Sequence, residues 1–261
     1  MAYIGHTDYY FEAAKGNVTG VSVVDKFGRN PAVGTTYVPI SVGGLYQTPQ
    51  PASATTLRIK AGGDANDTAA GTGAREVTVV GLDASGNEQT VAIATNGASA
   101  STATTETFIR LYRAYVSESG TYATQSAGSH ADDIVIENGG GGTDWLTIDS
   151  TGFPRGQSEV GAYSIPAGKT GYLIGSTIST DSGKTTDIIF FKRESILDTA
   201  APYEAMRVVF SEQIGAGGAT AVKPKIPVDG LVGPCDVGYM AKVDTGTASI
   251  EIGFQLLLVD S

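Results

Sequence analysis

The sequence contains very little cysteine, histidine or tryptophan. Its 261 residues include one cysteine, Cys235, so an intrachain disulfide and a thiolate metal cluster are excluded. We expect Cys235 to be a small buried apolar residue. Trp145 is the one tryptophan, and its setting in "TDWLTI" favours a core or interface position. The two histidines, His6 and His130, lie in polar stretches and are expected to be exposed loop residues.

Positive charge is also scarce. Charged residues make up 17% of the chain, where about 25% is ordinary. The net charge is -10 and the sequence pI is about 4.6. An acidic surface without a long basic run disfavours nucleic acid and anionic membranes as partners. No apolar run approaches the ~18 residues of a membrane span. The start, "MAYIGHTDYY", lacks the charged and apolar regions of a signal peptide, so we expect synthesis in a reducing cytoplasm.

Glycine and short apolar runs are what the sequence has instead. It contains 35 glycines, and segments such as "TTYVPISV" and "DIIFFKRE" recur between turn-forming residues. This spacing predicts roughly fourteen or fifteen short strands, without the amphipathic helices of a parallel α/β fold. We predict an all-β fold, an antiparallel, jelly-roll-like β-sandwich built from two tightly associated halves. The expected divisions are 1–50 for an N-terminal arm and first strands, 51–155 for the first half, and 156–261 for the second half.

The clearest hairpin signal is "GTGAREVTVVGLDASGNEQTVAI", residues 71–93. Gly86 and Asn87 stand in its turn, where a positive φ costs these residues little. Its apolar residues populate both faces of the first strand, which predicts an interior hairpin covered on two sides. The later segment "ETFIRLYRAYVSES", residues 106–119, alternates as a long strand. We expect its Arg110 and Arg113 to lie near the surface.

No motif for catalysis, cofactor binding or metal binding is complete. "AGKTG" and "SGKTT" contain Gly-Lys-Thr, but Tyr163 and Ile178 occupy the positions where a phosphate loop needs a further glycine. "SHADD" places Ser129, His130 and Asp132 side by side, which is no evidence for a catalytic triad. We therefore assign no catalytic, cofactor-binding or metal-ligating residue, and expect no cofactor and no enzymatic activity.

Acidic loops leave two alternatives open. Asp64 and Asp67 lie in "GGDANDTAAG", where carboxylate oxygens could bind calcium, although the EF-hand pattern is absent. We favour a solvated turn. Paired carboxylates such as Asp132 and Asp133 could serve a glycosidase, but their separation cannot be deduced from sequence.

Three aromatic residues follow one another near the N-terminus: Tyr9, Tyr10 and Phe11. They fall in a short predicted helix that Thr7 or Asp8 would cap and Gly16 would end. Consecutive residues cannot share one helical face. The aromatic residues therefore either anchor the chain against a neighbouring chain or fold back on their own domain.

The chain resembles a known family over most of its length. "GTGAREVTVVGLDASGNEQTVAI", "TFIRLYRAYV" and "SIPAGKTGYL" follow in the order seen in structural proteins of tailed bacteriophages, especially phages of marine bacteria. "DKFGRNPAVGT" and "GGLYQTP" are similar to that family too. One departure is Gln89-Thr90-Val91, where "ETV" is more familiar; it should not alter the fold. Members are labelled virion, head-decoration or tail-associated proteins.

The resemblance implies a non-enzymatic virion protein. We expect a decoration or cement protein on the capsid exterior, made in the host cytoplasm, which binds the major capsid protein and itself as a homo-oligomer, with a trimer as the expected form. The residues expected at the contact are Tyr9, Tyr10, Phe11 and Phe27. The alternative is a tail or fibre component that binds a host-surface glycan or receptor. Its aromatic platform would be built from Trp145, Tyr112 and Tyr122. An enzyme such as a depolymerase is the third hypothesis.

Overall fold

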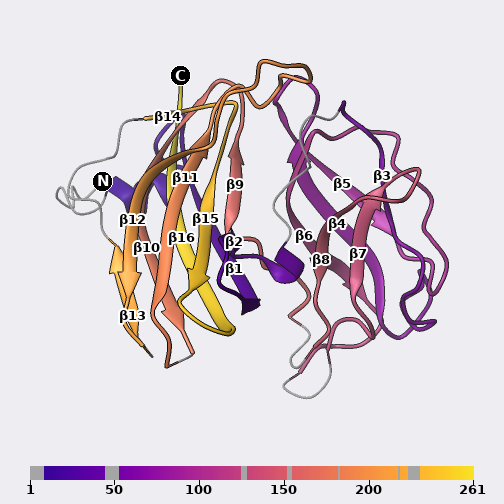
Figure 1. Cartoon of the computed structure of the whole chain (residues 1–261). Helices are drawn as coiled ribbons and strands as arrows, with labels where there is room; N and C mark the ends of the chain where they lie inside the picture. The colour runs from indigo at the N-terminus through magenta and orange to yellow at the C-terminus, as the bar shows by residue number, and fades with distance from the viewer. Residues whose placement is uncertain are drawn as a thin grey trace.

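The computed structural model describes residues 9–44, 53–124, 128–151, 155–181, 183–216, 218–222 and 230–261. These residues form two β-sandwich lobes that lie side by side (Figure 1). The first lobe holds the strands from the middle of the chain, and the second lobe holds strands from both ends. Every strand pairing within the four sheets is antiparallel, so the predicted all-β sandwich is confirmed.

The first lobe packs two three-stranded sheets against each other. One sheet has the order β3 (Leu57–Ile59), β7 (Ile134–Asn138), β8 (Asp144–Ile148). The other has the order β5 (Glu88–Ala94), β4 (Ala74–Leu82), β6 (Arg110–Ser119). Its core contains fully buried Phe108, Leu111, Ile136 and Leu146, together with Trp145, which is 1% exposed as the sequence predicts for a core residue.

The second lobe packs two five-stranded sheets. One contains β1 (Val21–Val33), β16 (Ala248–Asp260), β10 (Lys169–Thr180) and β13 (Ala219–Val222) in that order, with β14 (Leu231–Val232) also paired to β10. The other contains β12 (Arg207–Ile214), β11 (Thr186–Arg193), β15 (Cys235–Val243) and β2 (Val38–Pro39) in that order, with β9 (Ala162–Ile165) also paired to β15.

The two ends of the chain meet in the second lobe. β1 pairs with β16 from Val21 opposite Val259 to Val33 opposite Ala248. The first strands therefore lie in the sheets of the C-terminal strands, and residues 53–151 form the first lobe between them. Among the described residues, two short helices accompany the strands: α1 (Tyr9–Ala14) and the 3-10 helix η2 (Val42–Gly44). In Figure 1, α1 lies near the N label, on the side of the second lobe that faces away from the first.

The predicted hairpin is β4–β5. Its turn is closed by Asp83, whose backbone N–H donates to the Asn87 carbonyl at 2.9 Å and whose Oδ1 accepts from the N–H groups of Ser85 and Asn87. Gly86 has the expected positive φ, +80°. β4 is the central strand and is largely buried, as predicted. β5 contradicts the prediction because it is an edge strand, in which Ile93 alone is buried.

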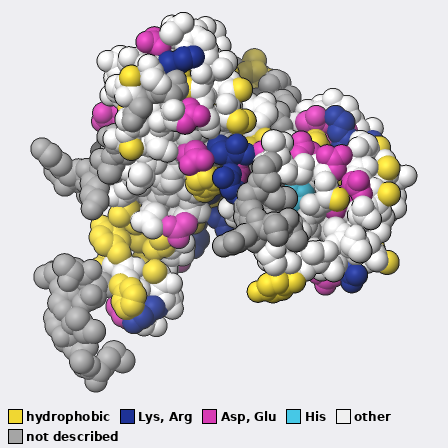
Figure 2. Space-filling view, turned by 90° about the horizontal axis from the view of Figure 1, so that it is seen from below, with side chains coloured by type: hydrophobic (Ala, Val, Ile, Leu, Met, Phe, Trp, Pro, Cys, Tyr) yellow, Lys and Arg dark blue, Asp and Glu magenta, His cyan; other side chains and the backbone are white. Residues whose placement is uncertain are grey.

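Hydrophobic and polar contacts join the lobes. Leu82, Ile109 and Tyr112 come from the first lobe but pack into the second lobe's core. The β4–β5 turn touches the second lobe, where the Ala167 N–H donates to the Gly86 carbonyl at 2.8 Å. Figure 2 shows basic and acidic side chains next to each other where the lobes meet. The two halves are therefore tightly associated, as predicted.

Candidate functional site

Helix α1 presents its aromatic side chains to solvent. Tyr9, Tyr10 and Phe11 are 46%, 49% and 58% exposed, and Ala13 is the one buried residue of the helix. The Tyr9 and Tyr10 rings meet edge to face with centroids 5.8 Å apart. The Lys15 ammonium lies 4.2 Å from the centroid of Phe11. The helix thus buries Ala13 and leaves about half of each aromatic side chain exposed. His6, Thr7 and Asp8 lie outside the described residues.

Phe27 has different surroundings. It is half-buried in β1, opposite Gly253 of β16, and the Arg155 guanidinium lies 6.0 Å from its ring centroid. Arg155 belongs to the segment between β8 and β9 that connects the lobes. Phe27 therefore contributes to the region where the lobes meet, whereas the three aromatic residues of α1 form one surface patch.

The aromatic platform of the tail alternative is not formed. Trp145 and Tyr112 are 1% and 2% exposed, and only Tyr122 is open to solvent, at 91%. The Trp145 indole N–H donates to Asn138 Oδ1 at 2.6 Å, so its polar group is satisfied inside the first lobe. Sequence alone could not separate these residues, because burial depends on which sheet or lobe covers each strand.

Asp67 is a buried structural residue, and the prediction of a solvated turn is wrong for it. Its side chain is 4% exposed, and its oxygens accept backbone N–H bonds from Ala74 at 2.7 Å, Ala131 at 3.1 Å and Asp132 at 3.2 Å. These donors occupy the oxygens that a calcium ion would need. No group of three or more His, Cys, Asp or Glu side chains suited to a metal occurs in the part of the chain that the structure describes.

His130 is also buried, at 5% exposure, which corrects the expectation of an exposed loop histidine. Its Nδ1 lies 3.1 Å from Ser129 Oγ, and its Nε2 lies 3.3 Å from the Asp149 carbonyl oxygen. Burial lowers the pKa of this imidazole. A catalytic triad has its serine at Nε2 and a carboxylate at Nδ1, whereas here the serine lies at Nδ1 and a backbone carbonyl at Nε2, so this pair lacks the geometry of a triad.

Arg110 is completely buried, contrary to the surface position predicted for it, because the second lobe covers that part of β6. Its Nε donates to Asp236 of β15, and Asp236 also accepts a bond from the Ser164 hydroxyl at 2.7 Å. Arg113 is exposed, as predicted. The sequence contains no signal for the Arg110–Asp236 pair, because these residues stand 126 positions apart on different lobes.

A cleft of about 390 Å³ lies between the lobes. One wall comes from β1 of the second lobe, and the other comes from the exposed face of β4, β5 and β6 in the first. Tyr163 of β9 closes one side. The residues that line the cleft are Val23, Val24, Asp25, Val80, Glu88, Thr90, Tyr112, Arg113, Tyr115 and Tyr163.

A β-bulge shapes this cleft. Val80 pairs with Arg113 and Gly81 pairs with Leu111, so Tyr112 has no partner on β4. Bulges kink a strand and re-aim its side chains. The carbonyl of Tyr112 accepts a bond from the buried Lys26 ammonium of β1, and its ring meets the Tyr163 ring edge to face, with centroids 4.6 Å apart. Burial, with a further contribution from Arg113, holds the pKa of Lys26 well below its ordinary value.

Glu88 is one of the two carboxylates that line the cleft, and Asp25 is the other. Its Oε2 accepts a short hydrogen bond from the Tyr112 hydroxyl and a second from the Tyr163 hydroxyl at 3.3 Å. Burial and the adjacent Glu88 charge raise the pKa of both phenols, so they remain protonated donors. Across the cleft, the Arg113 guanidinium donates to the Asp25 carbonyl. The two lobes thus hold two carboxylates, a guanidinium and three phenols around one space.

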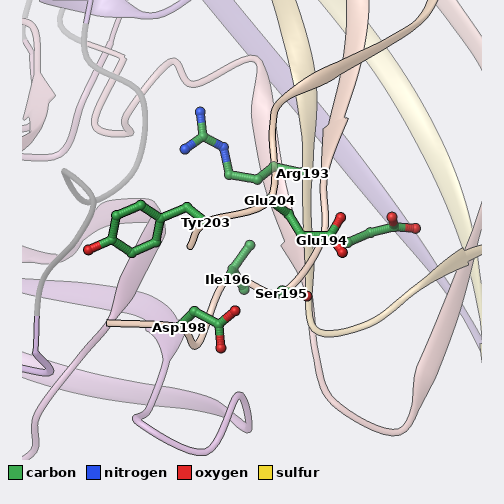
Figure 3. A pocket seen from close by; sticks show the side chains of 7 residues that line it. All are labelled: Arg193, Glu194, Ser195, Ile196, Asp198, Tyr203 and Glu204. Atoms are coloured by element: carbon green, nitrogen blue, oxygen red, sulfur yellow. The ribbon is translucent and has the colours of Figure 1, made fainter. Parts of the chain in front are cut away.

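A smaller pocket of about 170 Å³ lies at the loop after β11 (Figure 3). Ser195 in this loop has φ +51°, the one positive φ outside glycine among the described residues. Figure 3 shows the Arg193 guanidinium on one side and Asp198 on the other, with Tyr203 beside them. The buried Nε of Arg193 has no hydrogen-bond partner in the described part of the chain. The pocket is small, and its three carboxylates outnumber its one guanidinium.

The described residues contain no helix that is long and apolar enough to cross a membrane. No family model matches this chain, and no curated protein matches it. Among solved structures, the chain is similar to the infectious bursal disease virus VP2 subviral particle at 9% identity. The match covers 96% of this chain and 81% of that chain, with a TM-score of 0.20. At that TM-score the likeness carries no argument about this protein.

Proposed function

We propose that this protein is a non-enzymatic structural protein of a tailed-phage virion. It acts as a decoration or cement protein on the capsid exterior, binds the major capsid protein, and assembles as a homo-oligomer, with a trimer as the specific expectation. The phage assignment rests on the sequence resemblance. The structural observation that carries the assembly role is helix α1, with Tyr9, Tyr10 and Phe11 between 46% and 58% exposed.

Such a patch suits a contact with another protein. Fully burying a side chain such as Phe contributes about 1.5–3 kcal/mol, and aromatic residues are enriched in the energetically dominant parts of interfaces. Tyr9, Tyr10 and Phe11 are consecutive on one short helix and project in different directions, so a partner surface that encloses the helix can cover all three. The major capsid protein is the occupant that we propose. A shell presents many copies of one site, so binding there would stabilise the shell by mass action.

The rigidity and the charge of the two lobes are consistent with a protein on the surface of a particle. Its lobes are joined by a buried ion pair and a shared apolar core, which favours a rigid attachment over a hinged one. The net charge of -10 favours solubility and keeps an exterior protein off packaged nucleic acid. The edge strand β5 would otherwise invite aggregation, and packing on a particle would cover it.

The test is binding of the purified chain to particles of the same phage that lack it. The triple variant Tyr9→Ser, Tyr10→Ser, Phe11→Ser is expected to lose at least tenfold in affinity by co-sedimentation. The matched control replaces three exposed tyrosines elsewhere, Tyr37, Tyr122 and Tyr203, which are 40%, 91% and 45% exposed. It should bind as the natural chain does. Circular dichroism shows whether each variant is folded.

The position in the particle is tested separately. A reconstruction of the virion should show this chain on the outer shell in hundreds of copies, clustered by the local symmetry. Density only at the tail, at about a dozen copies, would overturn the decoration proposal in favour of the tail alternative. Equal binding of the two triple variants to the particles would show that α1 does not form the contact with the shell.

A further inference from the structure

We infer that the cleft between the lobes binds a neutral saccharide, one sugar unit of a larger glycan. This inference goes beyond shell attachment, because the cleft is formed by residues other than those of α1. Its volume of about 390 Å³ falls in the range of small-molecule sites, about 300–1,000 Å³. Both lobes contribute to its walls, and sites between two structural units are common positions for ligands.

The cleft contains hydrogen-bonding groups without partners. In the described part of the chain, Glu88 Oε1 and the side-chain hydroxyls of Thr90 and Tyr115 make no hydrogen bond, whereas Glu88 Oε2 is held by two phenols. Arg113 uses one of its nitrogens on the Asp25 carbonyl and keeps further N–H donors. The open groups therefore comprise an anionic acceptor, cationic donors and two hydroxyls that can do either.

This mixture selects a polyhydroxylated ligand. Sugar hydroxyls donate and accept, so one ring can satisfy Glu88, Thr90 and Arg113 together. The CH face of the ring can pack on Tyr115, which is 37% exposed, and on the valines of β1. An apolar ligand would remove water from Glu88 Oε1 without giving that oxygen a hydrogen-bond partner. A polyanion would be repelled by the Glu88 and Asp25 carboxylates and by the net charge of -10.

The site is preorganised. The bulge at Tyr112 directs that phenol toward Glu88, and the Lys26 bond to the Tyr112 carbonyl fixes the bulge from the opposite lobe. Tyr112 and Tyr163 then hold the Glu88 carboxylate in one orientation. A prearranged acceptor avoids part of the entropy cost that weakens small-ligand binding.

The test uses the whole purified chain and four free sugars: D-glucose, D-galactose, D-mannose and N-acetyl-D-glucosamine. Saturation-transfer NMR should detect binding of at least one, and a titration should provide its Kd. Thr90→Val keeps the shape of the side chain and removes its hydroxyl, and Tyr115→Ala removes the stacking ring. Each is expected to weaken binding at least tenfold. The matched controls are Thr102→Val, in a separate groove beside β5, and Tyr122→Ala.

Three results would overturn the inference. The first is no saturation transfer from the protein to any of the four sugars. The second is binding that Thr90→Val and Tyr115→Ala leave unchanged, which would place the sugar elsewhere. The third is binding of an acidic polysaccharide or a peptide in the cleft with no free sugar bound. Shell binding is a separate readout: the α1 triple variant should retain the sugar site, so the two proposals can fail independently.

Discussion

The Arg110 guanidinium and the Asp236 carboxylate form a completely buried ion pair across the two lobes. Nε of Arg110 lies 2.9 Å from Oδ2 of Asp236, and the two side chains are 0% and 1% exposed. The remaining polar atoms are also engaged: Arg110 NH1 donates to the Ile109 carbonyl, and the Ser164 hydroxyl donates to Asp236. A buried pair of this kind is tolerated because its hydrogen bonds are satisfied.

Breaking this pair should be costly. Asp236→Asn leaves the Arg110 charge buried without its counter-ion, which typically costs about 3–5 kcal/mol. We expect a loss of that size in the free energy of unfolding, measured with urea. The double variant Arg110→Met, Asp236→Leu removes both charges and should recover much of the loss.

The control is an exposed pair of the same charge type. Lys60 and Asp144 are 43% and 37% exposed, so Lys60→Met should cost far less than Asp236→Asn. A cost for Asp236→Asn no larger than that of Lys60→Met would mean that the buried pair does not hold the lobes together.

Asp67 should be the most sensitive residue of its loop. Asp67→Asn replaces one oxygen with an NH₂ group that faces backbone N–H donors, so buried donors lose their acceptor. We expect a loss of about 2–3 kcal/mol in the free energy of unfolding. Asp64→Asn is the matched control, because within the described part of the chain the Asp64 carboxylate accepts the Asn66 N–H alone, in a more open position. Equal losses for the two variants would contradict the structural role of Asp67.

The strand pattern of this fold can be predicted from sequence, and its long-range contacts cannot. Alternation and turn residues predict the β4–β5 hairpin, because both signals are local. The same alternation places Arg110 on an outer face of its strand. It is buried there because β15, from the other lobe, covers that face with Asp236. No local signal reports which surface a second lobe will cover.

The candidate cleft was beyond sequence analysis for the same reason. It depends on the bulge at Tyr112 and on the approach of β1, a strand that pairs with β16 at the far end of the chain. Both follow from pairing register. The α1 aromatic residues are the opposite case, because three consecutive aromatic residues cannot all face one core.

Cys235 should be inert in the folded protein. It is fully buried, and burial together with the adjacent Asp236 charge raises the pKa of its thiol to about 12. The thiolate is the reactive form, so Ellman's reagent at pH 8 should label no thiol in native protein and one thiol per chain in guanidinium. Rapid labelling of the native chain would contradict this burial.

Stability should fall as the pH drops through the range of His130. Burial lowers the pKa of this imidazole below its ordinary value of 6.5, so the unfolded chain binds more protons once the pH falls below that value. The favourable contribution of neutral His130 is complete above pH 6.5 and is lost progressively below it, with a slope of at most about 1.4 kcal/mol per pH unit. Asp149 also faces this histidine through its carbonyl, but the lowered pKa of its carboxyl acts below 3.8 and leaves this window unaffected. The free energy of unfolding, measured with urea, should therefore be lower at pH 5.5 than at pH 7.5 in the natural chain. The decrease should be smaller in His130→Gln, because glutamine does not titrate. An equal drop in both proteins would assign the pH dependence to other groups.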